Sequence, residues 1–259
     1  MLFAILLGAA IGYAIGKLPG LLIGGVLGAL AFNRLKNKLV GRLRDLQFGF
    51  VESVFAVMGA VSKADGVVTR DEIQMAEAMF DRFRLNESQR EAAKAAFNRG
   101  KAEDFNLDAE LARFRQVCGG QSALLQMFLQ VQVSAVSADG QVHPAEHEML
   151  VRIARGLGLP ESVVEQLEAT LRGARAGASG ARNYSTSQQI DDAYKTLGVS
   201  PSVDDAELKR AYRKLMSENH PDKLAGRGLP DSMKEMAEER TREISNAYDI
   251  VKEARKQAS

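Results

Sequence analysis

Two short histidine-containing stretches hold the residue types in this chain that could do chemistry. The first is His220-Pro221-Asp222, which places an imidazole and a carboxylate on the two sides of a proline. Pro221 cannot continue a helix and disfavours helical geometry at His220. We therefore expect an exposed His-Pro-Asp turn between two helices. A lone tripeptide of this kind most often only ends a helix, so a functional role can be inferred only from the residues on either side of it.

The second stretch, His143-Pro144-Ala145-Glu146-His147, matches the H-x-x-E-H zinc pattern letter for letter. Proline favours the first turn of a helix, which would leave His143 at the helix cap and away from the face that carries His147. We therefore expect no zinc hydrolase, and neither a metal nor a cofactor in this chain.

Two amphipathic helices are predicted on either side of the His-Pro-Asp turn. Asp204 and Asp205 open the first helix, whose apolar residues recur at steps of three and four and leave a basic outer face. The turn would then lie at the tip of an antiparallel helix pair, with a short helix that ends at Gly198 packed across it. The apolar positions are Leu208, Ala211, Tyr212 and Leu215 in the first helix and Met233, Met236, Ala237, Ile244, Ala247, Tyr248 and Val251 in the second.

This segment closely resembles the J-domain family over about residues 190–254, and we assign residues 188–259 to the module. The resemblance implies a protein with no catalysis of its own, which activates the ATPase of a DnaK-type heat-shock chaperone. It also implies that His220, Pro221 and Asp222 trigger hydrolysis. The resemblance rests on Ala193-Tyr194-Lys195-Thr196-Leu197-Gly198-Val199, the basic run 209–215, His220-Pro221-Asp222-Lys223 and Glu243-Ile244-Ser245-Asn246-Ala247-Tyr248. The docking residues that it implies are Lys209, Arg210, Tyr212, Arg213, Lys214 and Lys223.

The N-terminus is predicted to be a membrane anchor, residues 1–33. Between Leu2 and Phe32 the only charged side chain is Lys17, and at about 1.5 Å per residue the stretch can cross a bilayer core of roughly 30 Å. Residues 34–44 add five basic and no acidic side chains, so the positive-inside rule places the remainder of the chain in the cytoplasm.

We therefore expect one pass through the bacterial inner membrane, with a periplasmic N-terminus. The alternative is a hairpin of two short helices broken at Pro19 and Gly20, with Lys17 near the far surface.

Glycine recurs at every fourth position of the anchor. Small residues four apart line one face of a helix, and in lipid they let two backbones pack closely. The pattern predicts a homodimer formed through this face. Its members are Gly8, Gly12, Gly16, Gly20, Gly24 and Gly28.

Residues 45–172 are predicted to form an all-helical domain of about seven or eight helices, because apolar residues recur at helical spacing throughout. A duplicated pattern, Ala64-Asp65-Gly66-Val67-Val68 and Ala138-Asp139-Gly140-Gln141-Val142, recurs at an offset of 74 residues. Glycine suits the turn, and the aspartate can bond to nearby backbone amides. The duplicated pattern resembles the TerB-like helical domain.

Composition sets the remaining expectations. Residues 45–172 carry 13 basic and 19 acidic side chains, a net charge of −6, which argues against nucleic acid as a partner. Cys118 is the only cysteine, so no intrachain disulfide forms and a reducing compartment fits. Residues 173–187 are mostly small and polar, and they predict a flexible linker.

The chain is thus expected to be all-α: a transmembrane helix, a TerB-like helical bundle, a flexible linker and a J-domain helical hairpin. This arrangement resembles membrane-anchored DnaJ-like co-chaperones. An alternative function is a membrane scaffold or envelope-stress signalling adaptor that acts mainly through the TerB-like domain. The sequence does not identify clients, a ligand of the middle domain or the preferred DnaK paralogue.

Overall fold

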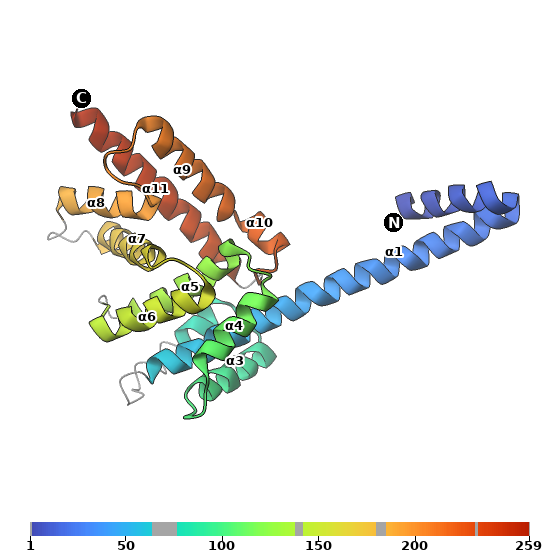
Figure 1. The fold of residues 1–259 in the computed structure, drawn as a ribbon, viewed down its shortest axis with the longest axis horizontal. Helices are drawn as coiled ribbons and strands as arrows, with labels where there is room; N and C mark the ends of the chain where they lie inside the picture. The colour runs from blue at the N-terminus through green and yellow to red at the C-terminus, as the bar shows by residue number, and fades with distance from the viewer. Residues whose placement is uncertain (1, 64–76, 138–141, 180–184, 231–232, 259) are drawn as a thin grey trace. The chain divides into compact units, whose positions relative to one another are not determined.

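The computed structural model describes residues 2–63, 77–137, 142–179, 185–230 and 233–258, and these residues form helices and connecting turns without a β-strand. The all-α prediction is therefore confirmed. The chain divides into two compact units, residues 1–46 and residues 47–259 (Figure 1). The duplicated Asp-Gly turns and most of their flanking residues lie outside the described residues.

The anchor is a helix that reverses its direction. Helix α1 (Leu2–Ser62) contains two residues with non-helical backbone angles, Gly16 (φ −131°, ψ 20°) and Lys17 (φ 51°, ψ −134°), and the chain folds back there (Figure 1). Pro19 follows two residues after Lys17, in the first turn of the second arm. Backbone N–H groups have no partner within the helix at that position, so the N–H that proline lacks is not needed. The predicted apolar N-terminal helix is present, and in this structure it reverses at Gly16–Lys17 instead of running straight. The alternative, a hairpin, matches the structure, with the break three residues earlier than predicted.

The glycine face explains why the two arms pack so closely. A Cβ added to Gly8 would overlap the carbonyl oxygen of Gly24, and one added to Gly12 would overlap that of Gly20. Gly28 meets the backbone of Ala4 in the same way, whereas Gly16 lies in open space at the reversal. The chain's own second arm therefore covers the face that was expected to pair with another copy.

The larger unit begins with a helical bundle, residues 47–179. Helix α5 lies at its centre, because 12 of its residues are buried and they occupy all of its faces. Phe128 of α5 stacks on Phe114 with ring centroids 4.3 Å apart, and Phe50 of α1 meets both rings at 5.3 and 6.1 Å. The bundle comprises the end of α1, a helical stretch over 77–82, α3 (Glu87–Gly100), α4 (Leu107–Val117), α5 (Ser122–Val136), α6 (Pro144–Leu157) and α7 (Ser162–Ser179).

The J module, residues 185–258, comes next as four helices: α8 (Thr186–Leu197), α9 (Asp205–Glu218), α10 (Pro221–Gly226) and α11 (Lys234–Ala258). Local signals set their ends. Ser185 and Gln188 form a capping box at the start of α8, and Gly198 ends it with φ 67°. The Asp204 carboxylate accepts the Glu207 backbone N–H at 2.7 Å and begins α9.

The predicted flexible linker is wrong over its first half. Residues 173–179 continue α7 as a helix, while residues 180–184 lie outside the described residues. Helix α8 then packs directly on α7. The Gln166 side chain donates to the Thr196 carbonyl oxygen at 2.6 Å, and Arg172 contacts Asp192 through two nitrogens at 2.9 and 3.3 Å.

The hairpin predicts a specific crosslink. In the structure the Ala9 Cβ lies 3.8 Å from the Cβ position of residue 25, which is about the mean spacing across a disulfide. Oxidation of the Ala9→Cys/Gly25→Cys variant, in a Cys118→Ser background, should therefore close a disulfide within one chain, detected by mass spectrometry after proteolysis. In one straight helix these positions would be about 24 Å apart.

Ala9→Cys alone is the matched control, because it offers only a partner in a second copy. Double-cysteine protein that stays reduced, or that links only different copies, would rule out the hairpin.

Candidate functional site

The His-Pro-Asp turn has the exposed corner geometry that the sequence predicts. His220 is the N-cap of α10 with extended backbone angles (φ −62°, ψ 127°), and Pro221 occupies the first turn. The Asp222 backbone N–H donates to His220 Nδ1 at 3.2 Å, so this nitrogen must be unprotonated in the contact. The side chains of His220 and Asp222 are exposed. The corner is thus held from within while its imidazole edge and carboxylate face outward.

Two side chains next to the turn fix how the chain enters and leaves it. Asn219 is buried, and its side-chain amide donates to the Leu215 carbonyl oxygen at 2.9 Å, which satisfies the last turn of α9. Lys223 Nζ donates to Ser217 Oγ at 2.5 Å, across the turn from α10 to α9. The Asn219 bond closes the end of α9, and the Lys223 bond joins α10 to α9 across the tripeptide.

The predicted docking residues divide between an outward face and a core contact. The ring of Tyr212 is half-buried and stacks on Tyr248 of α11, with centroids 4.3 Å apart and planes inclined by 20°. The structure thereby places Tyr212 mainly between α9 and α11. The outward set, which we name the basic face, consists of the exposed Lys209, Arg210, Arg213, Lys214 and Lys223.

The far end of the module is tied by Arg255. Its Nε donates to the Tyr194 hydroxyl at 2.9 Å, and its two terminal nitrogens reach Asp205 Oδ1 and the Val203 carbonyl oxygen, each at 2.7 Å. One guanidinium therefore joins α8, the start of α9 and the last turns of α11. Motif matching did not single out this residue.

The H-x-x-E-H stretch is a helix start in the structure. His143 is the N-cap of α6, and Glu146 accepts the His143 backbone N–H at 2.8 Å. His147 Nδ1 lies 2.8 Å from Glu168 of α7 instead of facing His143. Among the described residues no three histidine, cysteine or acidic side chains converge on a point that could hold a metal.

Cys118 lies in the bundle core at the end of α4. Burial raises the pKa of its thiol to about 12, so little of the nucleophilic thiolate exists near neutral pH.

Comparison with known proteins identifies the two parts of the larger unit. The TerB family, described as tellurite resistance protein TerB, matches residues 52–169, and the DnaJ domain matches residues 192–259. Co-chaperone protein DjlA of Vibrio vulnificus strain CMCP6 is 46% identical over 221 residues, covering 78% of this chain and 77% of its own. Co-chaperone protein DjlA of Escherichia coli O157:H7 is 38% identical over 262 residues, covering 95% of this chain and 97% of its own. The chain belongs to the DjlA co-chaperone family.

Membership in the DjlA family confirms the J domain, the TerB-like domain and the co-chaperone class inferred from the sequence. A DjlA co-chaperone is a regulator rather than a catalyst, and its J domain implies a partner of the DnaK type. Among the described residues, the stretch Leu2–Lys38, which includes the reversal, is long and apolar enough by length and composition to cross a membrane, and this fits a membrane-anchored protein. No solved structure matches the chain.

Two features of the site were absent from the sequence predictions. Helix α10, which opens at the His-Pro-Asp turn, places Leu224 in the same apolar cluster as the bundle core. Arg240 of α11 is buried and donates to Thr170 of α7 at 2.6 Å. A buried arginine in a helix of mostly charged residues gives no sequence signal, because the same pattern describes a solvated face.

Proposed function

We propose that the protein is a membrane-anchored co-chaperone that stimulates the ATPase of a DnaK-type heat-shock chaperone. The observation that carries this proposal is an exposed His-Pro-Asp turn joined to an outward basic face, within a matched J domain. The basic face would attract an acidic surface of the chaperone and orient it. The corner would then bias the ATP-loaded chaperone toward hydrolysis, and the nucleotide chemistry would stay within the chaperone.

We further propose that the chaperone is met at the cytoplasmic face of a bacterial inner membrane. Five basic side chains lie between residues 34 and 44, and they favour the anionic cytoplasmic leaflet. Anchoring would raise the local concentration of the J module for any chaperone or client held at the same membrane.

A homodimer formed through the anchor is also proposed. The glycine face admits a second backbone at contact distance, as its packing on the chain's own second arm illustrates. A second copy can take that place only when the arms separate. Each copy would then cross the membrane once, with its N-terminus in the periplasm.

The alternative function, a scaffold or envelope-signalling adaptor, would work through the TerB-like domain. Deletion of residues 45–172 separates the two functions poorly, because α10 and α11 pack on that domain. A point change in the turn is sharper: an adaptor would keep its membrane phenotype with His220→Gln, and a chaperone activator would lose it.

The first prediction concerns the turn itself. His220→Gln removes the ring nitrogen that accepts the Asp222 N–H and the imidazole edge that faces outward, so stimulation should fall to the chaperone's basal rate. A steady-state DnaK ATPase assay with the full chain in lipid nanodiscs measures it. His143→Gln is the matched control, because His143 also caps a helix in front of a proline. Equal stimulation by wild type and His220→Gln would exclude the turn as the trigger.

The second prediction concerns the basic face. Arg213→Glu should raise the concentration that gives half-maximal stimulation by roughly tenfold, about 1.4 kcal/mol of binding free energy, and high salt should narrow the difference. The control is Arg242→Glu, the same exposed charge reversal on α11. Equal half-maximal concentrations for Arg213→Glu and Arg242→Glu would refute docking of the chaperone through the basic face.

The third prediction concerns the homodimer. Two differently tagged copies should co-purify from membranes, and Gly12→Leu/Gly24→Leu should abolish this because neither position has room for a side chain beside a packed helix. Gly41→Leu, in open space, is the control. The oxidised Ala9→Cys/Gly25→Cys variant, whose arms are locked together, should not co-purify. Undiminished pairing of this locked variant would show that the copies meet elsewhere.

A further inference from the structure

The apolar residues of the J module belong to two different clusters. Seven of them form a core of their own between α8, α9 and α11. A second group, from α10 to the first turns of α11, belongs instead to the cluster that fills the helical bundle. Its members are Leu224 (0% exposed), Leu229 (1%), Met233 (0%), Met236 (2%) and Ala237 (0%).

Polar contacts trace the same boundary. The Gln47 side chain of α1 donates to the Leu229 carbonyl oxygen at 3.3 Å, and Arg84 pairs with Glu235 at 3.1 Å. Arg82 is paired with Glu239 on the next turn of α11. These contacts fix the loop after α10 and the start of α11 from the side of the bundle.

A buried arginine lies deeper in this boundary. Arg240 is 4% exposed, donates to Thr170 Oγ1 at 2.6 Å and lies 3.7 Å from Glu243. Burial lowers the pKa of Arg240, and the nearby Glu243 carboxylate opposes this. A guanidinium withdrawn from water needs a matched partner, so the Thr170 hydroxyl favours one docked arrangement of α11 on α7 over a sliding contact.

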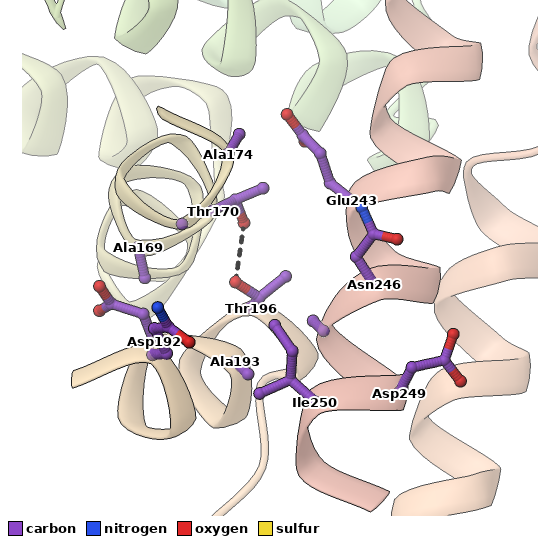
Figure 2. A pocket seen from close by; sticks show the side chains of 13 residues that line it. Ala169, Thr170, Ala174, Asp192, Ala193, Thr196, Glu243, Asn246, Asp249 and Ile250 are labelled. Carbon is purple, nitrogen blue, oxygen red and sulfur yellow. Dashed lines mark hydrogen bonds between the residues drawn. The ribbon is translucent and has the colours of Figure 1, made fainter. Parts of the chain in front are cut away.

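The surfaces of α7, α8 and α11 that face one another enclose a cavity of about 540 Å³. Figure 2 shows Thr170 and Thr196 joined by a hydrogen bond across it, with Ile250 directed toward Ala193. The J module therefore packs on the bundle in two places: along α8, which hydrogen-bonds to α7 beside this cavity, and through the apolar contacts near α10 together with Arg240.

Helix α10 connects this buried segment to the His-Pro-Asp turn. Leu224 lies just beyond Asp222 in the same short helix, and it is fully buried while Asp222 is exposed. Helix α10 has only six residues, so it has little stability without tertiary contacts. On its other side the turn is held by α9 and the separate J core. The exposed corner is therefore supported by two cores, one of which belongs to the bundle.

We propose that the TerB-like domain supplies the apolar support beneath α10, so that Leu229 and Thr170 act as positioning residues for the His-Pro-Asp turn. The inference rests on the proposed ATPase stimulation. The basic face lies mainly on α9, which keeps its own core. Loss of the support therefore weakens triggering and leaves docking of the chaperone largely unchanged.

Leu229→Ala tests this in the full chain in nanodiscs, by titration of the chaperone's ATPase. We expect maximal stimulation to fall about fivefold while the half-maximal concentration changes by less than about twofold. Leu229→Met, which nearly conserves volume, should restore the wild-type maximum. Leu111→Ala is the matched control: this leucine is equally buried in the same cluster, but it lies on α4 against Gly156 of α6.

A milder pair keeps the test valid if Leu229→Ala fails to fold. Thr170→Val removes the α7 hydroxyl that accepts the hydrogen bond from Arg240. The control is Thr241→Val, next to Arg240 on α11, because the Thr241 hydroxyl bonds only to a carbonyl oxygen of its own helix in this structure. We expect about a twofold lower maximum for Thr170→Val and no change for Thr241→Val.

Three outcomes would overturn the proposal: Leu229→Ala and Leu111→Ala lower the maximum equally, Leu229→Ala changes only the half-maximal concentration, or Thr170→Val and Thr241→Val behave alike. Absence of stimulation by the wild-type chain is a separate result, because it contradicts the proposed function itself.

Discussion

The burial of the segment after the His-Pro-Asp turn in the core of the helical bundle is the contact that ties this turn's own helix, α10, to the TerB-like domain. Apolar burial contributes about 25 cal/mol per Å², and five side chains between Leu224 and Ala237 lie almost wholly out of water there. Their burial and the packing of α8 on α7 both join the TerB-like domain to the J module within one compact unit. A polar and partly charged rim surrounds this contact, and Arg240 gives it a single register. The exposed turn is therefore followed directly by a segment that is buried in a domain preceding it in the chain.

The outer surface of the J module is determined by which side chains its core leaves exposed. Helix α9 buries Leu208 and stacks Tyr212 on Tyr248, so its lysines and arginines face solvent. Pro221 then interrupts the helix and turns the chain, and His220 satisfies the backbone N–H of Asp222. Under the proposed function, such a surface would change the chaperone's rate by selecting one of the chaperone's conformations.

The sequence predicts the parts of this protein better than their association. The His-Pro-Asp tripeptide, the basic run and the helix caps are local patterns, which can be recognised without knowing the tertiary arrangement. The glycine series is more ambiguous, because a face shaped for a close helix looks the same whether that helix belongs to another copy or to the same chain. The small side chains of residues 173–179 predict a linker, yet alanine and arginine favour helix and α7 continues through them. Met233 and Met236 are predicted to lie within the helix pair of the J module, since apolar spacing identifies a buried face without naming the surface that covers it.

Arg255 sets a limit on where the polypeptide can be shortened. It belongs to the last turn of α11, yet its hydrogen bonds reach back to Tyr194, Val203 and Asp205, which lie 50 residues or more earlier in the chain. A stop codon placed before this arginine would release the 199–204 loop and the first turn of the basic helix together. The last turn of α11 is consequently part of the structure that holds the J module together. A genetic fusion or tag should therefore be attached after Arg255 and should not replace this turn.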